Sequence, residues 1–215
     1  MELPRERINN QSMGEEIANA ISHGTGALLA TAGAAVLIVA AALHGRVIDI
    51  VSSAIYGSSL IFLYLASTLY HSLTSYTAKR LFQIFDHCAI FILIFGSYAP
   101  LSLSLIGGVA GWALLSWNIL LTLIGLILNS ISVKRFQAIS MALYLLMGWS
   151  VIMAIKALPP LPQTAWVLLI CGGLAYTLGI IFFALKKPRF MHFIWHLFVL
   201  AGSALHYFLI LLFVI

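Results

Sequence analysis

The sequence predicts an all-α membrane protein, a bundle of seven transmembrane helices that forms a single domain over residues 1–215. Of the 215 residues, 62% are hydrophobic and 8% are charged, whereas a soluble domain carries roughly 25% charged residues. Apolar stretches of about 18 or more residues recur along the chain, and each is long enough to cross a hydrocarbon core of about 30 Å. These stretches are continuous rather than alternating, which favours helices over a transmembrane barrel.

The predicted spans follow one another with short connections, so consecutive helices are expected to be neighbours. The first begins after the polar residues 1–16 and lacks an obvious cleavage site, which favours a spanning helix over a signal peptide. Prolines break the chain between spans five and six, and Pro188 ends span six, because proline cannot continue a helix. Pro100 lies inside span three and is expected to kink it. The seven spans are 18–43, 50–72, 83–105, 109–131, 137–156, 164–185 and 193–214.

The basic residues predict which way the bundle sits in the cell membrane. Nine of the eleven lie before span one or in alternate connections on the same side. Cytoplasmic loops carry an excess of lysine and arginine, so the N-terminus is predicted to be cytoplasmic and the C-terminus outside. The net charge of +5 is thereby explained by membrane anchoring, and no nucleic-acid partner is expected. The nine are Arg5, Arg7, Lys79, Arg80, Lys134, Arg135, Lys186, Lys187 and Arg189; Arg46 and Lys156 lie on the other side.

Polar side chains gather at the predicted cytoplasmic ends of four different spans. Ionisable groups are expensive inside a membrane and usually mark a functional site. Their confinement to one layer of the bundle therefore predicts a single site near the cytoplasmic face. The residues are Glu16, Asn19 and His23 on span one, Ser67 and His71 on span two, Asp86 on span three, and His192 and His196 on span seven.

Three of these residues are histidines that could bind one metal ion. His192 and His196 are four residues apart, so both rings lie on one helical face, about 5–6 Å from each other. His71 is at the same predicted depth. Three neutral imidazoles with an open fourth position form a catalytic zinc arrangement. We therefore predict Zn²⁺ as the cofactor, with His71, His192 and His196 as its ligands.

Asp86 and Ser67 are the predicted catalytic residues beside this metal. Zinc lowers the pKa of a water molecule that it binds to about 7, and Asp86 could accept the proton of that water. The alternative for Asp86 is a structural ion pair with Lys79 or Arg80. Ser67 lies one turn before His71 and could hydrogen-bond the water or a substrate carbonyl; its alternative is a bond to its own helix backbone.

Glu16, Asn19 and His23 are predicted to support the metal from a second shell. Glu16 and Asn19 stand about one turn apart and could orient a ligand histidine. The alternative for the acidic pair Glu15 and Glu16 is a solvated helix start. For His23, a role around the ligands and a packing role are equally compatible with the sequence.

These spaced residues resemble the hemolysin III family, which forms a superfamily with the progestin and adipoQ receptors and the alkaline ceramidases. The segment SHGTGALLA in the first span is also typical of that family, and the similarity covers essentially the whole chain. The matching pattern is Glu16-x2-Asn19-x3-His23, Ser67-x3-His71, Asp86, and His192-x3-His196.

The resemblance implies seven transmembrane helices, a cytoplasmic N-terminus, and a zinc ion near the cytoplasmic side held by His71, His192 and His196. It also implies that Ser67 and Asp86 surround the reacting water. Superfamily members of known chemistry hydrolyse amide bonds of ceramide-like lipids. Bacterial members are linked to haemolytic activity and to membrane lipid homeostasis.

Three functional hypotheses follow. The leading one is a zinc-dependent hydrolase that cleaves an amide or ester bond of a membrane lipid. The second is a receptor-like or lipid-sensing membrane protein in which a structural zinc ties spans two and seven together without turnover. The third, an ion channel or proton pump, is disfavoured, because the ionisable groups stop in the inner layer instead of crossing the membrane.

Overall fold

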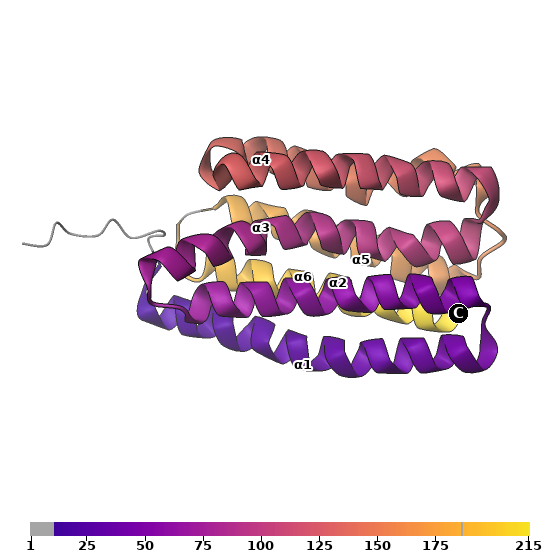
Figure 1. The fold of residues 1–215 in the computed structure, drawn as a ribbon, viewed down its shortest axis with the longest axis horizontal. Helices are drawn as coiled ribbons and strands as arrows, with labels where there is room; N and C mark the ends of the chain where they lie inside the picture. Colours follow the sequence, from indigo (N-terminus) through magenta and orange to yellow (C-terminus); the bar gives the residue numbers. More distant parts are fainter. Residues whose placement is uncertain (1–10, 186) are drawn as a thin grey trace, which may run out of the picture.

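The computed structural model describes residues 11–185 and 187–215, which form a bundle of helices with no strand in these ranges (Figure 1). Six helical segments of the described chain are long and apolar enough to cross a membrane. The prediction of an all-α, multi-pass membrane protein is therefore confirmed. In chain order the helices are α1 (Met13–His44), α2 (Val47–Ser72), α3 (Tyr76–Ala99), the π-helical η1 (Pro100–Ile106), α4 (Gly108–Gly148), the 3₁₀-helical η2 (Ser150–Ala157), α5 (Gln163–Ala184) and α6 (Met191–Phe213).

Helix α4 is the reason that six spanning segments are found where seven spans were predicted. It comprises two helical arms that meet at Ser132, a non-helical residue with φ −167° and ψ 107°. Residues eleven apart on a straight helix lie about 16 Å apart along its axis. Ser140 Oγ nevertheless donates to Asn129 Oδ1 at 2.9 Å. The chain therefore folds back at Ser132, whose Oγ accepts the backbone N–H of Arg135 at 3.3 Å as a cap of the second arm.

Several helix ends lie away from the predicted limits, because hydropathy marks the apolar part of a helix and not the polar turns at its ends. Helix α1 begins at Met13 instead of residue 18, after a capping box formed by Ser12 and Glu15. Helix α3 begins at Tyr76 instead of residue 83. At Pro100, where a kink was expected, α3 continues into the wider turns of η1, since proline lacks the N–H that an α-helix requires.

The packing of the helices brings four chain segments together at one end of the bundle. Helix α1 packs along α2, α2 along α3, and α5 along α6, while α6 also contacts α1. Figure 1 shows α1 and α4 at opposite edges, with the other helices between them. The start of α1, the end of α2, the start of α3 and the start of α6 meet, as the contacts of Glu15 and Glu16 described below demonstrate.

Small residues allow α1 and α2 to approach closely, as is common for helices in membranes. A Cβ atom added at Gly57 would lie 2.6 Å from the Cβ of Ala34 and 3.2 Å from its Cα. The second of these neighbours is backbone, so it could move only with the whole helix. Glycine at this position is therefore required by the spacing of the two helices.

We expect Gly57→Ala to lower the stability of the folded protein by about 1–3 kcal/mol, because the extra methyl group overpacks the α1–α2 contact. Thermal unfolding in detergent measures the effect. Gly148→Ala is the matched control, since a Cβ there would meet no atom within 4 Å. Equal midpoints for the two variants would contradict the close approach of α1 and α2.

Candidate metal centre

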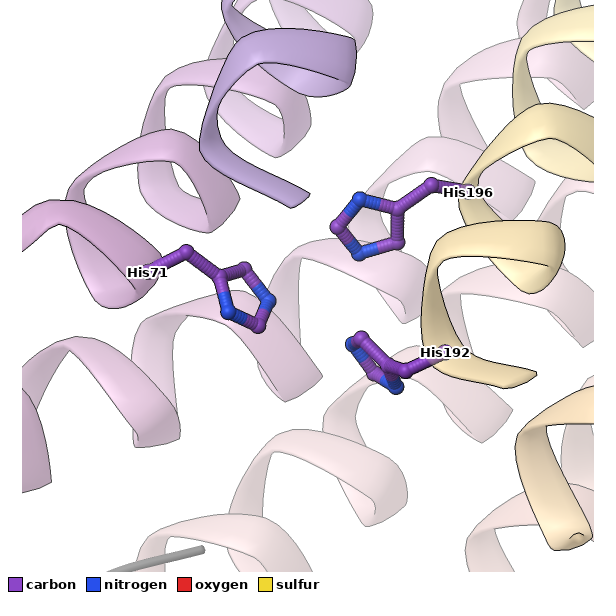
Figure 2. A group of neighbouring side chains, drawn as sticks. All are labelled: His71, His192 and His196. Carbon is purple, nitrogen blue, oxygen red and sulfur yellow. The ribbon is translucent and has the colours of Figure 1, made fainter. Parts of the chain in front are cut away.

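Three histidines from two helices meet at the end of the bundle where α1 begins. His71 is the penultimate residue of α2, and His192 and His196 lie in the first two turns of α6. One ring nitrogen of each lies within 4.8 Å of the others. The ring centroid of His71 is 5.1 Å from that of His192 and 5.1 Å from that of His196. Figure 2 shows the three rings turned toward the same space between the two helices.

The donor set fits a zinc ion. His71 and His196 are only 4% and 1% exposed. Nε2 of His71 and Nε2 of His192 are buried and have no hydrogen-bond partner within the described part of the chain. An unpaired buried polar atom costs about 1–3 kcal/mol, and a cation held between the rings would use both lone pairs. Neutral imidazole nitrogen is a preferred ligand of zinc.

Glu16 determines which nitrogen of His71 is available to a metal. Its Oε2 lies 2.7 Å from His71 Nδ1. An ionised carboxylate only accepts hydrogen bonds, so Nδ1 carries the hydrogen and the lone pair is on Nε2. A histidine that binds a metal commonly donates its other ring N–H to a carboxylate, which fixes the orientation of the ring. Asn19, also predicted here, is fully buried; its Nδ2 lies 3.5 Å from His71 Nδ1 and donates to Gln11 Oε1 at 2.9 Å.

Ser22 determines which nitrogen of His196 is available to a metal, although it was not among the predicted site residues. The Ser22 hydroxyl donates to the backbone carbonyl of Asn19 at 2.9 Å. Its lone pair therefore accepts from His196 Nδ1, which lies 3.0 Å away. This leaves Nε2 of His196 as the unprotonated nitrogen. The signal was present in the sequence, because Ser22 follows Asn19 by three residues and so lies on the same helical face.

His23 contacts one of the three histidines, and Ser67 lies one helical turn before another, His71. The ring of His23 stacks on that of His196, with centroids 3.5 Å apart and planes 7° from parallel. Both ring nitrogens of His23 are buried and have no partner among residues 11–185 and 187–215. Ser67 is fully buried, and its Oγ also has no partner there, so it does not bond to its own helix backbone. Both residues keep polar atoms available beside the centre.

Asp86 lies in the wall of a cavity of about 20 Å³ that His23, His192 and His196 also line. This volume is sufficient for about one water molecule. Lys79, one of the ion-pair partners considered for Asp86, instead contacts Glu16, with Nζ 2.8 Å from Oε1. Asp86 therefore lines the cavity without using that lysine, and its Oδ2 lies 3.8 Å from Nδ1 of the adjacent His87.

His87 also lines the cavity, although it was not among the predicted site residues. Its Nδ1 lies 2.9 Å from the backbone carbonyl of Gln83 and donates to it, which holds the ring in place. Helical spacing argued against selecting His87 together with Asp86, since adjacent residues on a helix point about 100° apart. In the bundle, however, Asp86 and His87 both reach the same small cavity.

Comparison with known proteins places the chain in a family. The family described as Haemolysin-III related matches residues 11–207. Hemolysin-3 of Bacillus cereus is 44% identical over 206 residues, which cover 95% of this chain and 94% of that protein. This chain belongs to the hemolysin III family. The Hemolysin-3 homolog of Bacillus subtilis (strain 168) is 46% identical over 198 residues, covering 92% of this chain and 93% of the relative.

A more distant relative of this hemolysin III protein is human. Monocyte to macrophage differentiation factor of Homo sapiens is 33% identical over 167 residues, which cover 73% of this chain and 67% of the relative. No solved structure matches the chain. The region that matches the hemolysin III family includes every residue of the candidate centre, from Glu16 to His196, so the predicted family is confirmed.

We expect Ser22→Ala to weaken the affinity of the purified protein for Zn²⁺ about tenfold, because loss of an outer-shell partner typically costs 10–100-fold. Competition with a chelator in detergent measures the dissociation constant. Thr25→Ala is the control, since its exposed hydroxyl bonds only to the backbone carbonyl of Ile21 on the same helix. An unchanged affinity in Ser22→Ala would show that Ser22 does not orient His196.

Proposed function

We propose that this hemolysin III protein is a zinc-dependent hydrolase that cleaves an amide or ester bond of a membrane lipid. One observation carries the proposal: His71, His192 and His196 converge beside a cavity that Asp86 also lines, and Nε2 of His71 and of His192 is buried without a partner in the described chain. A structural zinc site is normally closed by four protein ligands, whereas a catalytic site has three and an open position. Three described histidines and a neighbouring carboxylate correspond to the second kind.

Each polar residue of the centre would have a separate role in hydrolysis. When bound, zinc would act as a Lewis acid and lower the pKa of water. Asp86 would take the proton of the attacking water and return it to the leaving amine or alcohol. Ser67 Oγ, buried without a partner in the described chain, would donate a hydrogen bond to the carbonyl oxygen as it gains negative charge. Glu16 and Ser22 would hold His71 and His196 in the required orientation.

The cavity walls support a lipid as the substrate. Beside the polar residues, the cavity is lined by apolar side chains from α2, α3, α5 and α6. An acyl chain would pack against such a wall, while the bond to be cleaved lies at the polar end. Because the cavity has space for about one water molecule, the lining helices must separate for a lipid to enter. The apolar residues are Leu63, Ile90, Phe183, Trp195 and Val199.

We further propose that the chain crosses the cell membrane seven times, with a cytoplasmic N-terminus and the metal centre near the cytoplasmic face. The segment Gly108–Ala157 has 50 residues, about 75 Å of helix, which is more than twice the hydrocarbon thickness. Its two arms, joined at Ser132, would each cross once. Lys134 and Arg135 follow the bend directly, and the excess of basic residues on that side supports the orientation.

The second candidate is a receptor-like or lipid-sensing protein in which zinc only ties α2 to α6. The observation that favours it is the position of the histidines, since an ion between His71 and the pair on α6 would cross-link two helices of the bundle. Haemolysis, which the name Hemolysin-3 of the B. cereus relative indicates, would follow under this candidate from membrane perturbation, and under the first from altered membrane lipids.

Asp86→Asn separates the two candidates. If the protein is a hydrolase, the variant should lose at least about 100-fold of its turnover, the lower range for a general base, while its zinc content stays unchanged. The assay follows cleavage of a fluorescent ceramide and of a matching ester by purified protein in lipid vesicles. Zinc-loaded wild-type protein that cleaves no lipid amide or ester, or Asp86→Asn with full turnover, would favour the structural role.

Removal of the metal should lower the thermal stability of the wild-type protein. A ligand present at about 100 times its dissociation constant stabilises the folded state by about 2.7 kcal/mol. A chelator should therefore lower the midpoint of thermal unfolding of the wild type but leave that of His196→Ala unchanged, since this variant lacks one ligand. A similar chelator effect on both proteins would place the metal elsewhere in the molecule.

A further inference from the structure

We propose that Lys79 is a positioning residue for the metal centre: its ammonium group holds the Glu16 carboxylate in the orientation in which Glu16 accepts the N–H of His71. The inference rests on the proposed zinc site but not on any particular substrate. From the sequence, Lys79 was expected to orient the protein in the membrane or to pair with Asp86.

The geometry joins three helices in a short series of hydrogen bonds. Lys79 Nζ, at the start of α3, lies 2.8 Å from Glu16 Oε1 on α1. The other oxygen of the same carboxylate, Oε2, lies 2.7 Å from Nδ1 of His71 on α2. Each oxygen of Glu16 thus has its own partner. A lysine that donates to Oε1 leaves Oε2 directed toward the histidine.

The three side chains are largely removed from solvent, which gives the contact between Lys79 and Glu16 more weight than an exposed ion pair would have. The side chain of Lys79 is 13% exposed, that of Glu16 is 14% exposed, and that of His71 is not exposed at all. Solvent screening is weak at such burial. The orientation of the carboxylate therefore depends on the protein groups around it.

Lys79 is itself held on a second side. Its Nζ lies 5.0 Å from the centroid of the Tyr70 ring, within the range of a cation–π contact. Tyr70 directly precedes His71, and its hydroxyl accepts a hydrogen bond from Gln83 Nε2 at 3.4 Å. The lysine is thus placed between the helix that carries a metal ligand and the carboxylate that supports that ligand.

The neighbouring Arg80 provides a matched control. It carries the same charge at the next position of α3 but is exposed. If Lys79 and Arg80 act only through their positive charge, removing either one should change the Zn²⁺ affinity of the centre equally. If Lys79 acts through Glu16, only the change at Lys79 should matter.

The experiment measures the affinity of the full-length protein for Zn²⁺ alone, by competition with a chelator in detergent. Lys79→Met should weaken the affinity about tenfold, at the lower end of the 10–100-fold range for outer-shell residues, because Lys79 acts through Glu16. Lys79→Arg should restore it, since a guanidinium group can also donate to Oε1. Arg80→Met should leave the affinity unchanged, and metal-free Lys79→Met should still unfold in one cooperative transition, which shows that the variant folds.

A double-mutant cycle with Glu16→Gln tests the route of the effect. Once Glu16 has been replaced, adding Lys79→Met should cause little further loss of Zn²⁺ affinity. Equal losses with and without Glu16, an equal loss in Arg80→Met, or no loss in Lys79→Met would each overturn the role of Lys79. Wild-type protein that binds no Zn²⁺ would instead overturn the metal site and the proposed function together, so the two failures are distinct.

Discussion

The structure depends on hydrogen bonds from the first turns of α1 to histidines on α2 and α6. Imidazole nitrogens buried in an apolar bundle need partners, because an unpaired polar group there costs about 1–3 kcal/mol. Glu16 supplies the partner for Nδ1 of His71, and Ser22 supplies the partner for Nδ1 of His196. Both contacts leave the opposite ring nitrogen directed at the same space. Helix α1 thereby aligns two ligand-bearing helices that it contacts on either side.

The same end of α1 also positions α6 as a whole. Glu15 Oε1 accepts the backbone N–H of Phe190 at 2.8 Å, directly before the first residue of α6. Consecutive glutamates thus hold different helices: Glu15 holds the start of α6, and Glu16 holds the end of α2. The alternative that this acidic pair is merely a solvated helix start is wrong, since both carboxylates contact other helices. An acidic first turn that is favourable for the helix itself serves here to assemble the site.

Local sequence signals predicted the apolar segments but not how closely they follow one another. Hydropathy identified the apolar segments of the described chain, because a span of about 20 residues is a property of the chain itself. It did not predict that two of these spans would be separated by a single non-helical residue, Ser132, at which the chain bends sharply. The start of α1 was likewise decided by the hydrogen bonds between Ser12 and Glu15, which an average over apolar residues does not contain.

The sequence by itself determined the membrane class, the family, and the pairing of His192 with His196, because apolar length and residue spacing are encoded within single helices. The tertiary structure alone decided which groups meet between helices. It placed Lys79 on Glu16 rather than on Asp86, brought Ser22 to His196, and added His87 to the cavity. The rotation of each helix about its axis selects these partners, and that rotation is set by packing against neighbours that are distant in the chain.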